Sequence, residues 1–171
     1  DSVAARGLGD VYKRQAVKEI VQGVHWVRMP LPFQLDHINL WLIDDYDGWT
    51  LIDTGINTPE TKNLWLKLLP KLSYQGRIKR LICTHAHPDH MGLAGWFCDE
   101  FGLRLNTTKK EWDMGVRLSS GRIQEEAEFK QFFIKAGCSN NQIKLLSRHI
   151  LTSHRYFHKV PSAYIKIGDK D

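Results

Sequence analysis

Apolar positions from Val24 onward follow two different periods, which together predict alternating strands and helices. In VHWVRMPLP the alternation of apolar and polar residues predicts a strand that ends at Pro30 and Pro32. HINLWLIDDYDGWTLIDTG predicts two more strands, over residues 38–43 and 49–52. Because Asp47-Gly48 is a turn dipeptide that tolerates positive φ, it predicts a hairpin between them.

The next segment, NTPETKNLWLKLLPKL, has a helical period. Thr58 suits a helix N-cap, and Pro59 suits the first turn, where its missing N–H costs nothing. The apolar positions share one face: Leu64, Trp65, Leu68, Leu69 and Leu72. Pro70 is expected to kink this helix or end it early.

Further along, strand and helix patterns continue to alternate. IKRLICTH is a mostly apolar run, typical of a strand in a sheet that is covered on both faces. HMGLAGWFCDEFG predicts a helix closed by Gly102, and LRLNTT predicts a short strand. This order predicts an α/β fold with a layered sheet.

From Lys109 the pattern becomes helical. EEAEFKQFFIKAG and NNQIKLLSRHILTSHRYFHKV predict two helices, the second with Ile143, Leu146, Ile150 and Phe157 on one side. SAYIKIGDKD predicts a strand and a turn. We therefore expect a sheet and loop region over residues 24–108, a helical insert over 109–160 and the start of a further strand over 161–171. Residues 1–15 have no apolar period and are expected to be a non-native or disordered tail.

Composition narrows the class of protein. A chain of 171 residues with 42% hydrophobic and 25% charged residues suits one globular domain within 16–171, and its longest apolar runs are too short to cross a membrane. Three cysteines without CxxC spacing favour a reducing compartment, so we expect a cytoplasmic protein. The net charge of +5 is spread along the chain and lacks the pattern of an RNA-binding module. A small-molecule substrate is expected, with no nucleic acid or membrane partner. The sequence makes no prediction of the oligomeric state.

The strongest chemical signal is THAHPDHMG, which places three histidines and an aspartate within six positions. His85 and His87 are two apart at a strand end, so both imidazoles reach the same side. Asp89 and His90 follow after a turn and can serve a second site beside the first. Metal binding lowers the pKa of water to roughly 7, and Asp89 would orient the resulting hydroxide. The alternative, an aspartate at a helix start among surface histidines, leaves the clustering unexplained.

THAHPDHMG resembles the HxHxDH motif of the metallo-β-lactamase-fold hydrolases, and LIDTG (residues 51–55) resembles that family's other N-terminal signature. The resemblance implies an αββα sandwich with two zinc ions, manganese or iron being possible. His85 and His87 would bind the first ion, and Asp89 with His90 the second. Asp53 would support the metal loop through hydrogen bonds; its alternative role is that of a turn residue.

The family's remaining ligands, a histidine for each ion and a bridging aspartate, are expected beyond residue 171. The downstream histidines lack the expected spacing and are not expected to be ligands: His149, His154 and His158. His25 and His37 resemble strand-edge residues, and an approach of His37 to the cleft is the alternative for that residue. We therefore expect the N-terminal half of a domain, with weak zinc binding, poor turnover and an exposed apolar sheet face.

The function expected from these features is metal-dependent hydrolysis of an ester, thioester or lactone. A nuclease or phosphodiesterase of the same superfamily is an alternative, as is an incomplete, non-catalytic fragment that binds metal weakly. A lactamase is less favoured because no export signal precedes the first strand.

Overall fold

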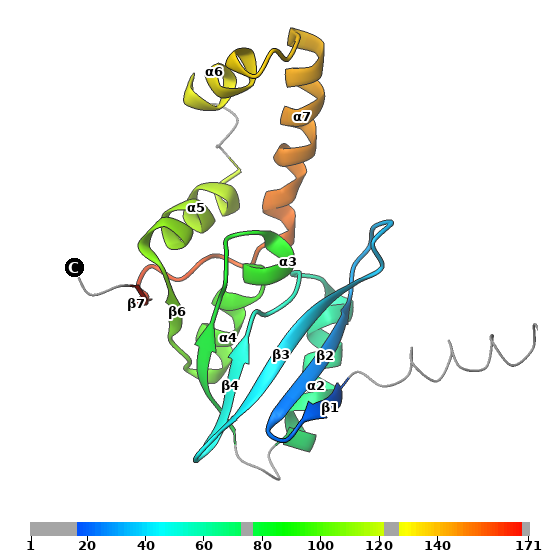
Figure 1. The fold of residues 1–171 in the computed structure, drawn as a ribbon, viewed down its shortest axis with the longest axis vertical. Coiled ribbons are helices and arrows are strands. Elements are labelled where there is room, and N and C mark those ends of the chain that lie inside the picture. The colour runs from blue at the N-terminus through cyan, green and yellow to red at the C-terminus, as the bar shows by residue number, and fades with distance from the viewer. Residues whose placement is uncertain (1–16, 73–76, 122–126, 169–171) are drawn as a thin grey trace, which may run out of the picture.

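The computed structural model describes residues 17–72, 77–121 and 127–168; the expected tail over 1–15 lies outside them. Its strands form one mixed sheet in which neighbours in the chain are neighbours in space (Figure 1). The first four strands pair antiparallel and the rest pair parallel. The strands are β1 (Val17–Val21), β2 (Val24–Pro30), β3 (His37–Asp45), β4 (Gly48–Ile52), β5 (Ile78–Ile82), β6 (Leu105–Thr107) and β7 (Ile165–Lys166). The strands predicted from the alternation are all present.

The hairpin between β3 and β4 is confirmed, but Gly48 serves a different purpose from the one expected. The turn lies at Tyr46 and Asp47, and Gly48 does not adopt a positive φ. A Cβ on Gly48 would lie 2.3 Å from the carbonyl oxygen of Arg77, which accepts a hydrogen bond from the Trp49 amide at 3.0 Å. Glycine is therefore needed here for the close approach of two backbones.

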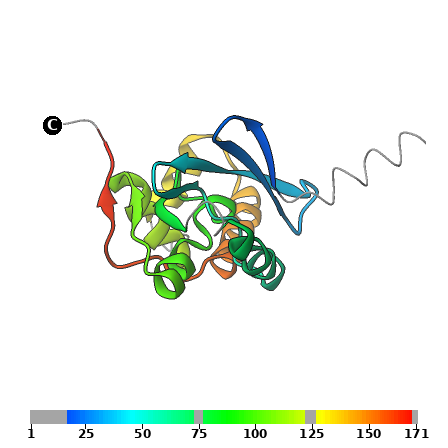
Figure 2. The same cartoon turned by 90° about the horizontal axis from the view of Figure 1, so that it is seen from below.

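Two helices, α2 (Pro59–Leu72) and α4 (Ala94–Phe101), cover one face of the sheet (Figure 2). Thr58 caps α2 through a hydrogen bond from the Thr61 amide to its hydroxyl at 3.2 Å. Pro70 does not end this helix, because α2 continues to Leu72; the kink expected there stays a prediction. Pro70 lies on the exposed side of the helix, where water can hydrate the carbonyl freed by the missing N–H.

The core lies between these helices and the sheet. Its largest fully buried members are Met29, Leu40, Leu42, Trp49, Leu51, Ile56, Trp65, Leu81, Met91, Leu93, Phe97 and Leu105. Trp65 and Phe97 meet edge to face, with ring centroids 5.2 Å apart. Burial of aromatic side chains of this size supplies a large share of a core's stability. The interior therefore holds α2 and α4 together against the strands.

On the opposite face of the sheet, apolar side chains of β3 are exposed in the part of the chain that the structure describes. Trp41 and Ile43, which alternate along β3 with buried leucines, are 36% and 38% exposed. In β5 the middle residues Lys79 and Arg80 are exposed, so the prediction that this strand is covered on both faces was wrong. The apolar run signalled a buried strand because Ile78 and Leu81, on either side of these two residues, do pack into the core.

The remaining helices lie beyond the carboxyl ends of the parallel strands (Figure 1). They are α3 (Pro88–Met91), α5 (Lys109–Ser119), α6 (Ala127–Lys135), α7 (Asn140–Ser153) and the short η3 (His154–Tyr156). Gly102 closes α4 with a φ of 66°, as expected of a helix C-cap. Among the described residues no helix combines the length and apolar character needed to cross a membrane.

Candidate metal centre

The histidine cluster occupies the bend between β5 and α3. Strand β5 ends at Ile82, residues 83–87 turn, and α3 begins at Pro88, a residue suited to a first helical turn. The turn starts at Cys83, whose side chain is buried in the core. A buried anchor on one side and a helix start on the other thus fix the bend that carries the four predicted donors.

His85 and His87 point ring nitrogens at each other. The distance from Nε2 of His85 to Nδ1 of His87 is 3.1 Å. A tetrahedral zinc ion with Zn–N bonds of 2.0–2.1 Å holds two nitrogens about 3.3 Å apart. The same distance suits an N–H···N hydrogen bond, so to bind an ion both lone pairs would have to turn toward a point beside the line that joins the nitrogens. The separation of the two nitrogens is thus close to that of a pair of zinc ligands.

His90 and Asp89 lie beside this pair, as the sequence predicted. The rings of His90 and His85 have centroids 4.0 Å apart, and Asp89 Oδ2 lies 3.5 Å from His90 Nε2. All four predicted donors are thus brought to one place. In the described part of the chain, however, no group of three or more His, Cys, Asp or Glu side chains is arranged to hold a metal ion.

Asp53 anchors the cluster from the end of β4. Its side chain is buried, and one carboxylate oxygen accepts hydrogen bonds from the Thr84 hydroxyl and His90 Nδ1, each at 2.8 Å. The other oxygen accepts the Thr84 amide hydrogen at 2.8 Å. Asp53 adopts a positive φ of 62°, a conformation that aspartate tolerates better than most residues.

These hydrogen bonds set the tautomers of two histidines. An ionised carboxylate only accepts, so Nδ1 of His90 carries the proton and Nε2 keeps its lone pair. The Thr84 hydroxyl donates to Asp53 and lies 3.0 Å from Nδ1 of His85, so its oxygen accepts from that nitrogen. His85 therefore also keeps a lone pair on Nε2, the nitrogen that faces His87.

The surroundings move the pKa values of these two imidazoles in opposite directions. Burial, followed by the neighbouring charges of His90 and His87, lowers the pKa of His85. For His90 burial acts downward, but the hydrogen bond and negative charge of Asp53 outweigh it and raise the pKa. His85 is therefore kept neutral, the form that binds a metal.

The backbone on both sides of the bend is tightly docked. The Thr54 amide and hydroxyl both donate to the His90 carbonyl at 2.8 Å, and the Leu93 amide donates to Gly55 at 3.1 Å. A Cβ on Gly92 would lie 2.1 Å from the Pro88 carbonyl oxygen and 2.9 Å from that of Gly55. This packing explains why the single helix predicted for this stretch divides into α3 and α4.

Glu111 takes part in the site and was not predicted from the sequence. It lies in the first turn of α5, and its carboxylate accepts the Ala86 amide hydrogen at 2.8 Å, between the two histidines. Thr108 caps α5, so Thr108-x-x-Glu111 matches the capping-box pattern. That pattern signals a helix start, but the side chain reaches across to the metal loop instead.

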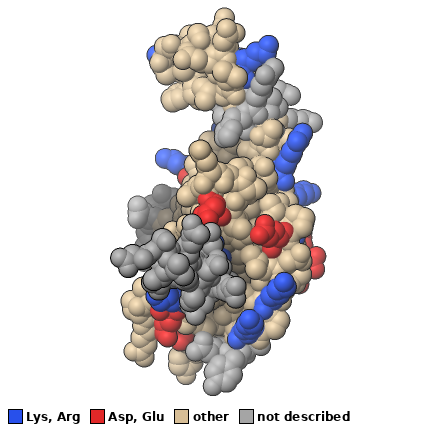
Figure 3. Space-filling model, turned by 90° about the vertical axis from the view of Figure 1, so that its right-hand side faces the viewer, with Lys and Arg blue, Asp and Glu red and all other residues tan. Residues whose placement is uncertain are grey.

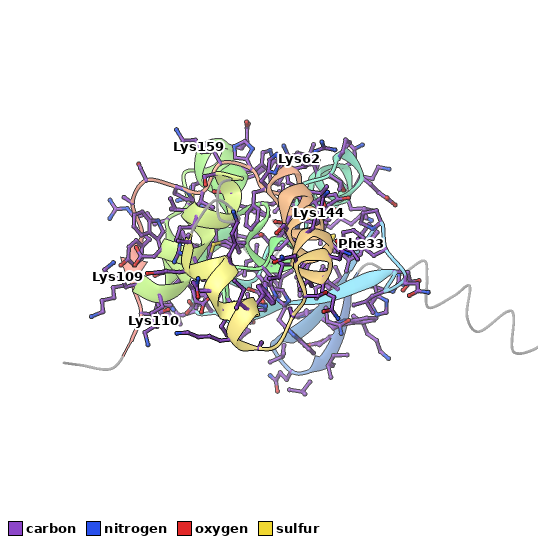
Figure 4. All side chains as sticks on the ribbon, turned by 90° about the horizontal axis from the view of Figure 1, so that it is seen from above. Phe33, Lys62, Lys109, Lys110, Lys144 and Lys159 are labelled. Carbon is purple, nitrogen blue, oxygen red and sulfur yellow. The ribbon has the colours of Figure 1, made fainter. Side chains whose placement is uncertain are left out.

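A cavity of about 720 Å³ opens beside the histidines. Phe33, labelled in Figure 4, borders it from the loop between β2 and β3. Its other lining residues are His85, Ala86, His87, Pro88, Glu111, Met114, Leu118, Thr152, Ser153 and Tyr156. The volume is in the range of small-molecule sites, and such sites commonly combine apolar walls with a few polar groups.

The other histidines have separate environments. His25 meets Trp49 edge to face, and His37 pairs with Asp36 at 2.6 Å. Nε2 of His158 lies 2.9 Å from Asp99 Oδ2 on α4, and a Cβ on Gly121 would touch the ring of His154 at 3.1 Å. None of these borders the cavity. The side chain of His149 lies outside the described part of the structure.

Comparison with known proteins identifies the family of the chain. The sequence profile of the metallo-beta-lactamase superfamily matches residues 34–138, more than half of the chain. A curated relative, a probable metallo-hydrolase (YqjP) of Bacillus subtilis strain 168, is 35% identical over 75 residues, which are 43% of this chain and 23% of that protein.

Solved structures share the fold over nearly the whole chain. A beta-lactamase domain protein from Burkholderia ambifaria has a TM-score of 0.70 and 32% identity, covering 91% of this chain and 45% of that one. A metallo-beta-lactamase family protein from Thermus thermophilus has a TM-score of 0.65 and 23% identity, and the match covers 90% of this chain and 48% of that protein. The chain thus spans less than half the length of these relatives. It belongs to the metallo-β-lactamase superfamily and has the α/β fold of its members.

Proposed function

We propose that this chain carries part of the active site of a metal-dependent hydrolase that cleaves an ester, thioester or lactone. His85 and His87 would hold the first of two zinc ions, and Asp89 with His90 the second; manganese or iron are other candidate metals. The observation that carries the proposal is the 3.1 Å approach of Nε2 of His85 to Nδ1 of His87. Membership of a superfamily with metallo-hydrolase relatives supports it.

A bound zinc centre supplies Lewis acidity toward a carbonyl oxygen and water activated near neutral pH. The chain's own residues prepare the site for this chemistry. Asp53 holds the proton of His90 on Nδ1, and Thr84 leaves Nε2 of His85 unprotonated. Asp89, which is part-exposed at the start of α3, would accept a proton from the attacking water and orient it.

The surface and the thiols support a small-molecule substrate in a reducing compartment. Lysine and arginine side chains on the face seen in Figure 3 are spread out and do not form a single basic patch. All three cysteines, Cys83, Cys98 and Cys138, are free of disulfides. We propose a cytoplasmic enzyme that acts on a soluble metabolite, without a nucleic acid or membrane partner.

Zinc titration by calorimetry tests the metal assignment. We expect weak binding to the chain, a fall of at least about tenfold in affinity for His85→Ala and His87→Ala, and no change for His37→Ala, a histidine away from the cavity. Tight binding that survives both substitutions would overturn the assignment. Zinc-loaded protein is then assayed on a phenyl ester, a thioester, a lactone and a phosphodiester. We expect slow, zinc-dependent cleavage of one of the first three, and phosphodiester cleavage alone would replace the proposal with the nuclease alternative.

A further inference from the structure

The cavity beside the histidines has a polar side and an apolar side. Glu111, Met114 and Leu118 all border it from α5. Their spacing of three and four residues puts them on one face of that helix. Glu111 contacts the metal loop, and Leu118 lies seven residues further on, about 10 Å along the helix axis. Along α5 the lining therefore changes from a carboxylate at the metal loop to apolar side chains further away.

Aromatic side chains form another wall of this apolar side. Phe33 and Tyr156 meet edge to face with ring centroids 5.4 Å apart, and both border the cavity. Phe33 is nevertheless 47% exposed. A large aromatic side chain left exposed at a cavity rim is a surface that an apolar ligand would cover favourably.

Backbone hydrogen bonds fix this wall to the metal loop. The Asn57 amide donates to the Tyr156 carbonyl at 3.0 Å, and the His158 amide donates to the Gly92 carbonyl at 2.7 Å. These bonds tie the segment after α7 to the loop before α2 and to the residue that follows α3. The apolar side of the cavity is thus held in place relative to the histidines without a ligand.

We propose that this cavity binds a straight apolar chain of the substrate, with the carbonyl group to be cleaved beside His85 and His87. The substrate class is thus an ester, thioester or lactone that carries a medium-length alkyl or acyl chain. Placing the reactive carbonyl rests on the proposed function. Binding of the chain depends only on the apolar lining, defined here as Phe33, Met114, Leu118 and Tyr156.

The test measures binding of straight-chain primary amides, from butanamide to octanamide, to the metal-free chain by calorimetry. These amides imitate the ester without being a good substrate. We expect affinity to rise about fourfold for each added methylene, the increment for burying one such group. Met114→Gln and Leu118→Gln should flatten the series, and Val116→Gln, on the same helix but away from this cavity, should leave it unchanged. A flat series in the unaltered protein, or equal slopes in all variants, would overturn the inference.

A parallel experiment separates this inference from the proposed function. Zinc-loaded protein is assayed on p-nitrophenyl esters whose acyl chain grows from butanoyl to octanoyl. A rising amide series together with absent zinc binding would refute the proposed function and uphold the apolar site. Zinc-dependent hydrolysis that ignores acyl length, alongside a flat amide series, would uphold the function and refute the apolar site.

Discussion

Asp53 offers the sharpest test of how the chain prepares its histidines. We consider two substitutions, Asp53→Asn and Asp53→Ala. Asparagine keeps the shape, tolerates the positive φ of 62°, and retains an oxygen to accept the Thr84 amide hydrogen. Its NH₂ group, however, replaces the oxygen that faces Nδ1 of His90. To avoid two facing donors, the imidazole must move its proton to Nε2, which removes the lone pair that a metal needs.

The expected magnitudes follow from the contacts. Alanine leaves the Thr84 amide and Nδ1 of His90 without their buried acceptor, at about 1–3 kcal/mol each, and adds about 1 kcal/mol of backbone strain. We expect Asp53→Ala to lower the free energy of unfolding by about 3–7 kcal/mol. Asp53→Asn replaces charged hydrogen bonds by neutral ones and should lower the free energy of unfolding by about 1–2 kcal/mol. Both should weaken zinc binding about ten- to a hundredfold.

Urea denaturation followed by tryptophan fluorescence, with and without zinc, measures both effects. Because Asp53 raises the pKa of His90, the extra stability of this pair is present below the ordinary imidazole pKa. This extra stability is lost as the pH rises through the raised pKa of His90 in the folded chain. Asp53→Asn should therefore cost more at about pH 5 than at about pH 8. Equal destabilisation by both variants, or unchanged zinc affinity in Asp53→Asn, would refute the tautomer argument.

Three further changes test the loop and the thiols. Glu111→Ala removes the acceptor of the Ala86 amide hydrogen and should lower zinc affinity about tenfold in calorimetry. Glu111→Gln keeps an acceptor oxygen and should keep most of the affinity. Equal losses of affinity in the two variants would contradict this role of Glu111. Gly92→Ala should lower the free energy of unfolding by at least about 3 kcal/mol in urea denaturation, because its Cβ would lie 2.1 Å from a carbonyl oxygen. The control Gly102→Ala, whose Cβ meets nothing within 4 Å, should lower it by about 1 kcal/mol. Similar losses in the two variants would argue against the tight docking of Gly92. Burial raises the pKa of Cys98 to about 11. Iodoacetamide should therefore modify this thiol about a hundredfold more slowly near pH 8 than in the unfolded chain, measured by mass spectrometry. Comparable rates in the folded and unfolded chain would contradict the raised pKa.

Most of the fold was predictable because its signals are local. Alternation identifies strands, and the Thr58-Pro59 start identifies α2, since each depends on residues close in the chain. The errors arose where a neighbour far along the chain decides the outcome. Gly48 is required by the backbone of Arg77, and the exposure of Lys79 and Arg80 depends on what covers the second face of the sheet.

The same division applies to the site. His85, His87, Asp89 and His90 lie within six residues, so a short bend is enough to assemble them. Glu111 reaches Ala86 across 25 residues, and its capping-box position suggests a purely local role. The exchange of one local partner for a distant one cannot be read from residue types alone.

The attachment of the helical segment to the metal loop is the hardest feature to predict, for a physical reason. Its key bonds join backbone groups, from Asn57 to Tyr156 and from His158 to Gly92. Every residue except proline can donate such a bond, so at most positions the bond leaves no trace in the type of residue found there. The exception is Gly92, where a Cβ would lie 2.6 Å from the Tyr156 carbonyl oxygen. In the sequence this contact therefore appears only as a glycine directly after HxHxDHM, and the wall of the cavity depends on it.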